Sequence, residues 1–189
     1  MGEMNIICNN CVGARIYQQS GEQFNNPFMW SLVSGDDFIY LINHFDKINF
    51  DRIRVRRVPK RDIFEIIVDD KVTLRFIHHH QNSKCIQPTK KGVDIFYNQM
   101  TSYLIGSYFR RVDRMKEKPI FVISDKISCE EGFTFNPDKI ENIHNSLSSI
   151  VFCGCDNPKV EGIKFVKVGD LDTTSIAKEA LKNIDFGKL

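Results

Sequence analysis

Short apolar runs alternate with segments of helical periodicity along most of this 189-residue chain. The clearest run, Ile120-Phe121-Val122-Ile123, is apolar at every position, which is typical of a central strand buried on both faces. Strands that alternate with helices indicate an α/β sheet with helices packed over it. By the same patterns we predict further strands at 5–8, 51–61, 63–68, 72–77, 150–153 and 163–168, and helices at 12–20, 38–45, 93–115, 137–147 and 173–181.

A hairpin is predicted in the middle of the chain, where Asp69-Asp70-Lys71 separates two strand-like runs. Since a hairpin pairs antiparallel strands, we expect a mixed sheet with a central hairpin. We find no internal repeat, low-complexity segment or linker, and the 42% apolar content is enough to fill a core. The expected organisation is therefore a single α/β domain over residues 1–189.

Several helix ends carry recognisable signals. Gly21 follows the first helical segment and is expected to end it in a left-handed conformation. Asp36 or Asp37 is expected to cap the second helix at its amino end, and Thr173 or Thr174 the last one.

The overall charge excludes a general nucleic-acid binder, because 26 basic and 24 acidic residues leave a net charge of only +2. The start of the sequence lacks the features of a signal peptide, and no apolar run is long enough for a membrane span. We therefore expect a cytoplasmic protein whose six cysteines are mostly free thiols. Six arginines and lysines between 51 and 61 predict a strand with one basic face, which would meet a phosphate, an acidic glycan carrier or only solvent.

Cys11 stands at the turn between the first predicted strand and the helix that starts at Val12. The first free N–H groups and the positive end of the helix dipole meet there, and this placement is expected to lower the pKa of a thiol and activate it as a nucleophile. The alternative is a free cysteine packed as a small apolar residue beside a turn.

A cysteine nucleophile needs a base to take its proton and an acceptor to orient that base. His78 is the first choice for the base, since it ends a predicted strand, and Asp125 follows the buried strand at its carboxyl end, where α/β folds place functional groups. Asn9, Asn10 and the backbone N–H of Cys11 are candidate oxyanion donors. A run of three histidines that merely ends a strand is the alternative.

Metal and redox chemistry are weaker options. Cys8-x-x-Cys11 and Cys153-x-Cys155 are two thiolate pairs that could meet across the sheet, but the second has a shorter spacing than a zinc ribbon uses. In a redox motif the attacking cysteine is the first of the pair, whereas here the second stands at the helix start. A lone Gly13 is not a dinucleotide fingerprint. We predict no metal and no cofactor.

Arg110, Arg111 and Arg114 end the long predicted helix of residues 93–115 and are candidates to bind an anionic part of a substrate, such as the phosphate of a nucleotide sugar. The alternative role is electrostatic, because basic residues at a helix carboxyl end complement its dipole.

The motif from Ile7 to Gly13, followed by Tyr17, Gly21 and Asn26-Pro27-Phe28, resembles a bacterial family of unassigned activity labelled as exopolysaccharide biosynthesis proteins. The order of Cys11, Pro27 to Trp30, histidine and Arg110 to Arg114 is also similar to a bacterial family described as papain-like cysteine peptidases. Both resemblances lie within about residues 5–125. Cys8 stands where the first family has serine, and His79 where it has tyrosine.

These resemblances single out Cys11 among the cysteines and His78 among the histidines. The function they imply is a cell-surface polysaccharide biosynthesis protein that uses Cys11 for acyl transfer or hydrolysis of a small-molecule or glycan substrate. The competing hypothesis is a non-catalytic module that binds a sugar nucleotide or glycan with its arginines.

Overall fold

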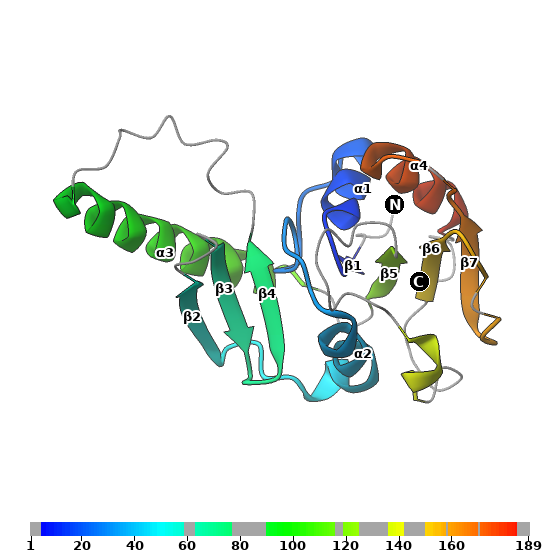
Figure 1. Ribbon diagram of the computed structural model, residues 1–189, viewed down its shortest axis with the longest axis horizontal. Coiled ribbons are helices and arrows are strands. Elements are labelled where there is room, and N and C mark those ends of the chain that lie inside the picture. Colours follow the sequence, from blue (N-terminus) through cyan, green and yellow to red (C-terminus); the bar gives the residue numbers. More distant parts are fainter. Residues whose placement is uncertain are drawn as a thin grey trace.

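The computed structural model describes residues 5–58, 63–76, 90–115, 119–124, 136–141, 150–157, 159–169 and 171–184. Its strands form two sheets, which confirms the α/β class (Figure 1). The first is parallel, in the order β1-β5-β6-β7, and the second is antiparallel, in the order β2-β3-β4. The strands are β1 (Ile6–Cys8), β2 (Ile53–Val58), β3 (Ile63–Val68), β4 (Val72–Phe76), β5 (Ile120–Ser124), β6 (Ile150–Gly154) and β7 (Ile163–Lys167).

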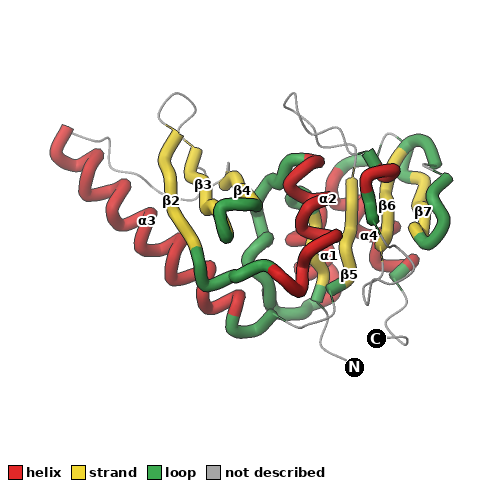
Figure 2. The backbone as a smooth tube through the Cα atoms, turned by 90° about the horizontal axis from the view of Figure 1, so that it is seen from below, coloured by secondary structure: helices red, strands yellow, loops and turns green. Residues whose placement is uncertain are grey.

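The helices are distributed over both sheets. Helices α1 (Val12–Ser20) and α4 (Thr173–Asn183) lie side by side on one face of the parallel sheet, and α2 (Gly35–His44) lies on the other face (Figure 1). Helix α3 (Lys90–Val112) runs along the antiparallel sheet (Figure 2). Two short 3-10 helices complete the described elements, η1 (Phe45–Lys47) and η2 (Pro137–Lys139). None of the described helices is both long and apolar enough to cross a membrane.

Two apolar clusters hold these layers together. Side chains alternate across a strand, so Ile6 and Cys8 of β1 pack in the cluster beneath α1 and α4. Ile7 points the other way, into a larger cluster that also contains Phe38 of α2 and Phe64 of β3. The larger cluster thus contains side chains from both sheets.

The ends of α1 agree with the prediction, since the helix begins at Val12 and Gly21 follows it with a φ of 74°. The other two caps lie just before the residues expected. Ser34 caps α2 by accepting a hydrogen bond from the Asp37 N–H at 3.2 Å, and Asp172 caps α4 by accepting one from the Ser175 N–H at 2.8 Å. Of the helix predicted at 137–147, the described residues contain only η2, and residues 142–149 lie outside them.

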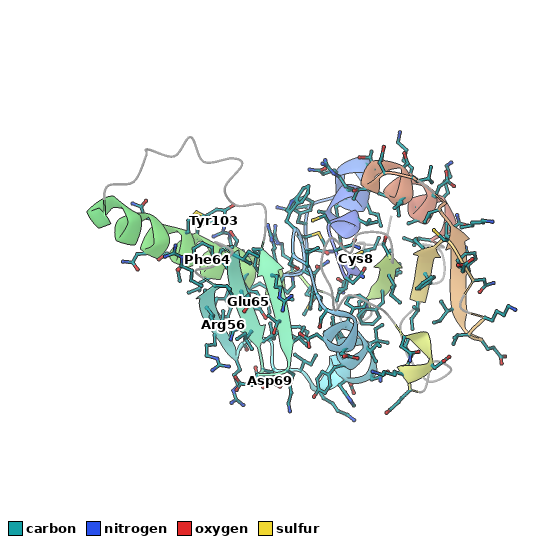
Figure 3. All side chains as sticks on the ribbon, viewed as in Figure 1. Cys8, Arg56, Phe64, Glu65, Asp69 and Tyr103 are labelled. Atoms are coloured by element: carbon teal, nitrogen blue, oxygen red, sulfur yellow. The ribbon has the colours of Figure 1, made fainter. Side chains whose placement is uncertain are left out.

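The predicted hairpin forms between β3 and β4, with Asp69 and Asp70 both at positive φ in the turn. Strand β2 pairs with β3 on its other side, so that among the described residues these strands form their own sheet instead of joining the parallel one. The charges on its surface are largely paired. Buried Glu65 accepts hydrogen bonds from Arg56 of β2 (Figure 3). Arg75 of β4 also donates a hydrogen bond to Glu65.

Candidate functional site

The turn after β1 is fixed to the end of β5 by two buried asparagines. Asn9 accepts a hydrogen bond from the Ser124 N–H at 2.9 Å and donates one to the Ser124 carbonyl at 3.1 Å. Asn10 donates to the same carbonyl at 3.2 Å. These contacts join residues separated by more than a hundred positions in the sequence, at the carboxyl edge of the parallel sheet. This edge is where open α/β folds bind ligands.

Asn10 also organises the start of α1. Its side-chain oxygen accepts a hydrogen bond from the Val12 N–H at 3.0 Å and one from the Cys8 thiol at 3.5 Å. The side-chain nitrogen of Asn10 already has an acceptor in the Ser124 carbonyl, so only its second N–H is left for the predicted oxyanion role. The main role of Asn10 in the described structure is to hold the turn.

Cys11 occupies the position immediately before α1, as predicted, and its side chain forms no capping hydrogen bond. The side chain is buried, with 7% of its surface exposed, and it packs in a small cluster with Leu32 and the partly buried Trp30. The thiol is thus at the carboxyl edge of the sheet but largely covered by the segment that contains these two residues.

Burial changes the acidity of Cys11 in the direction opposite to the one expected. Loss of solvent raises the pKa of the thiol to about 11, and the positive charge of Arg15, one helical turn further on, offsets this only in part. The expectation of a lowered pKa is therefore wrong. At neutral pH Cys11 is a protonated thiol, and it needs a base if it is to act as a nucleophile.

The segment that covers Cys11 also connects the two sheets. Leu32 and Arg75 exchange backbone hydrogen bonds of 2.8 and 2.9 Å, so Leu32 extends the antiparallel sheet at β4. The next residue, Val33, donates its N–H to the Asn9 carbonyl at 2.8 Å. The end of β4 is thereby joined to the turn that carries Cys11.

Two of the predicted catalytic residues, His78 and Asp125, lie outside the described residues. Residues shortly before each of them in the chain are described. Arg75 precedes His78 by three positions and pairs with Leu32, and Ser124 directly precedes Asp125 and bonds both asparagines.

The three predicted substrate-binding arginines lie together at the carboxyl end of α3. Arg110 donates to the Ser107 hydroxyl at 3.1 Å, and Arg114 donates to the Arg110 carbonyl at 2.9 Å. Arg111 is half-buried, and its burial lowers the pKa of the guanidinium. None of the three forms an ion pair with a described carboxylate.

The structure adds two residues that were not among the predicted site residues, Arg15 and Trp30. The guanidinium carbon of Arg15 lies 5.2 Å from the centroid of the Trp30 ring. Arg15 is four residues after Cys11 on a helix, a spacing that places both on one face and could have indicated it. The preceding residues Phe28 and Met29 are buried, whereas Trp30 remains partly exposed.

The other described cysteines differ in their exposure. Cys8 and Cys153 are buried thiols on the same face of the parallel sheet, and Cys155 is exposed. Within the described part of the chain, no group of three or more histidine, cysteine, aspartate or glutamate side chains is arranged to hold a metal ion. Cys85 and Cys129 lie outside the described residues.

Part of the chain matches a known family model. Residues 2–90 match a family described as a domain of unknown function, DUF1919, which is slightly less than half of the chain. The matched range contains Cys11, Trp30 and His78 and ends at the first residue of α3. No curated protein matches the chain.

Proposed function

We propose that this protein uses Cys11 as the nucleophile of an acyl-transfer or hydrolysis reaction in cell-surface polysaccharide biosynthesis, and that it works in the cytoplasm. His78 is the general base and Asp125 orients its imidazole. The resemblance of Cys11 and its neighbouring motif to bacterial exopolysaccharide biosynthesis proteins supports this setting.

The observation that carries the proposal is the convergence of three chain segments at Cys11. The thiol packs against Leu32, which pairs with Arg75, and three residues of chain from Arg75 to His78 span at most about 11 Å. Asn10, next to Cys11, bonds Ser124, the residue before Asp125. The described residues Arg75 and Ser124, which precede His78 and Asp125 in the chain, are therefore bonded to the segments that surround Cys11.

The raised pKa of Cys11 determines how the reaction would start. The thiol transfers its proton to His78 as sulfur attacks the carbonyl carbon of the acyl group. The bond to the leaving group then breaks, the imidazolium returns the proton to that group, and a thioester remains on Cys11. Water or an acceptor hydroxyl attacks the thioester while His78 takes its proton, and transfer of that proton to sulfur regenerates the thiol. The second N–H of Asn10 and the Cys11 N–H would stabilise the oxyanion.

The burial of the Cys11 thiol also favours a second candidate function, which is binding without catalysis. If Cys11 is only a packed thiol, its raised pKa needs no further explanation, and the arginines at the end of α3 would serve a module that binds a sugar nucleotide or glycan without catalysis.

Reaction with an activated ester separates the two candidates. Incubation with p-nitrophenyl acetate at neutral pH is expected to release a burst of about one nitrophenol per chain and to leave an acetyl group on Cys11, identified by peptide mass spectrometry. The C11S variant should lose the burst. The C155S variant is the control, because Cys155 is the exposed thiol among those described, and it should keep the burst. Acetylation confined to Cys155, or none at all, would rule out the nucleophile.

A further inference from the structure

Two arginines lie against an aromatic pair beside Cys11. Arg15 of α1 lies over the ring of Trp30, with its guanidinium carbon 5.2 Å from the ring centroid, and Arg111 of α3 lies over Phe24 at 5.8 Å. The two rings meet edge to face with centroids 6.4 Å apart. Residues from α1, α3 and the segment between α1 and α2 thus form one cationic and aromatic cluster.

The positive charges of this cluster lack an anionic partner among the described residues. Besides its contact with Trp30, the Arg15 guanidinium donates a hydrogen bond of 2.9 Å to the side-chain oxygen of the neutral Gln18. Arg111 donates to the Met29 carbonyl at 3.4 Å. Tyr103 nearby favours the charged form of Arg111, whereas the like charges of Arg114 and Arg110 disfavour it. By contrast, the arginines of the antiparallel sheet that flank Glu65 and Asp70 are paired with carboxylates. Burial removes part of the water around the Arg111 guanidinium and lowers its pKa, so a bound anion would offset this loss of hydration.

The backbone of Trp30 also points to a function for this cluster. Its φ of 62° lies in the left-handed region, which bulky residues rarely adopt. The flanking residues Met29 and Ser31 are buried and Leu32 is paired with β4, so they hold Trp30 in this conformation. Strained residues of this kind are concentrated at binding and active sites.

We propose that Arg15 and Arg111, with Trp30 and Phe24 between them, bind the phosphate or diphosphate group of an organic phosphate ester. Guanidinium groups match phosphate oxygens through paired hydrogen bonds. This inference rests on the proposed function, because it assumes that the bound phosphate belongs to the substrate that Cys11 attacks. The binding itself requires no thiol chemistry.

Trp30 provides a direct signal for this binding, because it is the single tryptophan of the chain. Inorganic pyrophosphate and uridine diphosphate are titrated separately while tryptophan fluorescence is recorded, with calorimetry in parallel. Saturable binding is expected, weakened about tenfold or more in R15Q and in R111Q, since each removes charged hydrogen bonds. R54Q is the matched control; Arg54 is an exposed arginine paired with Asp70, and its loss should leave the affinity unchanged.

The absence of binding to either probe, or an equal affinity in the parent, R15Q, R111Q and R54Q, would overturn the proposal. Thermal melting of each variant shows whether it is folded, and R111K tests Arg111 independently, because lysine keeps the charge but loses the paired geometry. C11S separates this inference from the proposed function. If C11S still binds the probes but loses the ester reaction, both the Cys11 nucleophile and the phosphate site are supported. If the parent binds the probes but shows no ester reaction, only the phosphate site is supported.

Discussion

Replacing Gly13 by alanine is expected to destabilise the protein by about 2 kcal/mol or more. A Cβ at position 13 would lie 2.6 Å from the Cβ of Cys8, a distance that such atoms do not adopt. Because Cys8 is fully buried in β1 and Gly13 is in the first turn of α1, neither can move without shifting a strand or a helix. Urea denaturation followed by circular dichroism measures the change in the free energy of unfolding.

Gly106 is the matched control for this substitution, since it is also a helical glycine. A Cβ there would meet only the end of the flexible Arg110 side chain, at 3.3 Å. The G106A variant is therefore expected to be as stable as the parent or more stable by about 0.5–1 kcal/mol, because alanine favours the helix. Equal stability of G13A and the parent would show that α1 and β1 are not in the close contact described.

The second large effect is expected for Asn10→Asp, which should cost about 3 kcal/mol. Aspartate keeps an oxygen for the Val12 N–H but cannot donate to the Ser124 carbonyl, and its carboxylate would face that carbonyl in a buried position. The turn that carries Cys11 would lose one of its bonds to β5. Thermal and urea unfolding at pH 7 measure the loss.

Asn98→Asp is the control for this charge change, because Asn98 is exposed on α3. Its free energy of unfolding should differ from that of the parent by less than about 0.5 kcal/mol. If N10D were as stable as N98D, Asn10 would not be fixing the turn, and its amide would be available for another role.

Local patterns predicted much of the fold because the responsible forces act between near neighbours. Gly21 ends α1 since a residue without Cβ adopts positive φ at little cost, and Asp69-Asp70 turns the chain between β3 and β4. The caps of α2 and α4 were misplaced by only a few residues. Ser34 and Asp172 have extended backbones, which lets each side chain reach the free N–H groups of the helix.

Local sequence patterns did not predict that the strands divide into two sheets, because strand pairing depends on contacts between residues far apart in the sequence. Nothing in the local sequence states that Ile6 pairs with Ile120, or that Leu32 pairs with Arg75. The apolar run at β5 shows only that the strand is buried on both faces.

The properties of the candidate site also depend on residues far apart in the sequence. The sequence placed Cys11 at a helix start, but the pKa of its thiol is controlled by desolvation, which depends on the remote segment that covers it. The cluster of Arg15, Trp30, Phe24 and Arg111 was missed because Arg15 and Arg111 are ninety-six positions apart and meet only through the two rings between them.

The most direct test of the central claim is the pH dependence of Cys11 alkylation by iodoacetamide in the parent, H78A and H79A proteins, read by mass spectrometry of the Cys11 peptide. If His78 is the base, the rate in the parent should rise first with a midpoint near the imidazole pKa of about 6.5, and again as the thiol itself ionises near its pKa of about 11. H78A should lose the first rise, and H79A, which removes the adjacent histidine, should keep it. A single rise near pH 11 in all three proteins would contradict the account and identify Cys11 as a buried structural thiol.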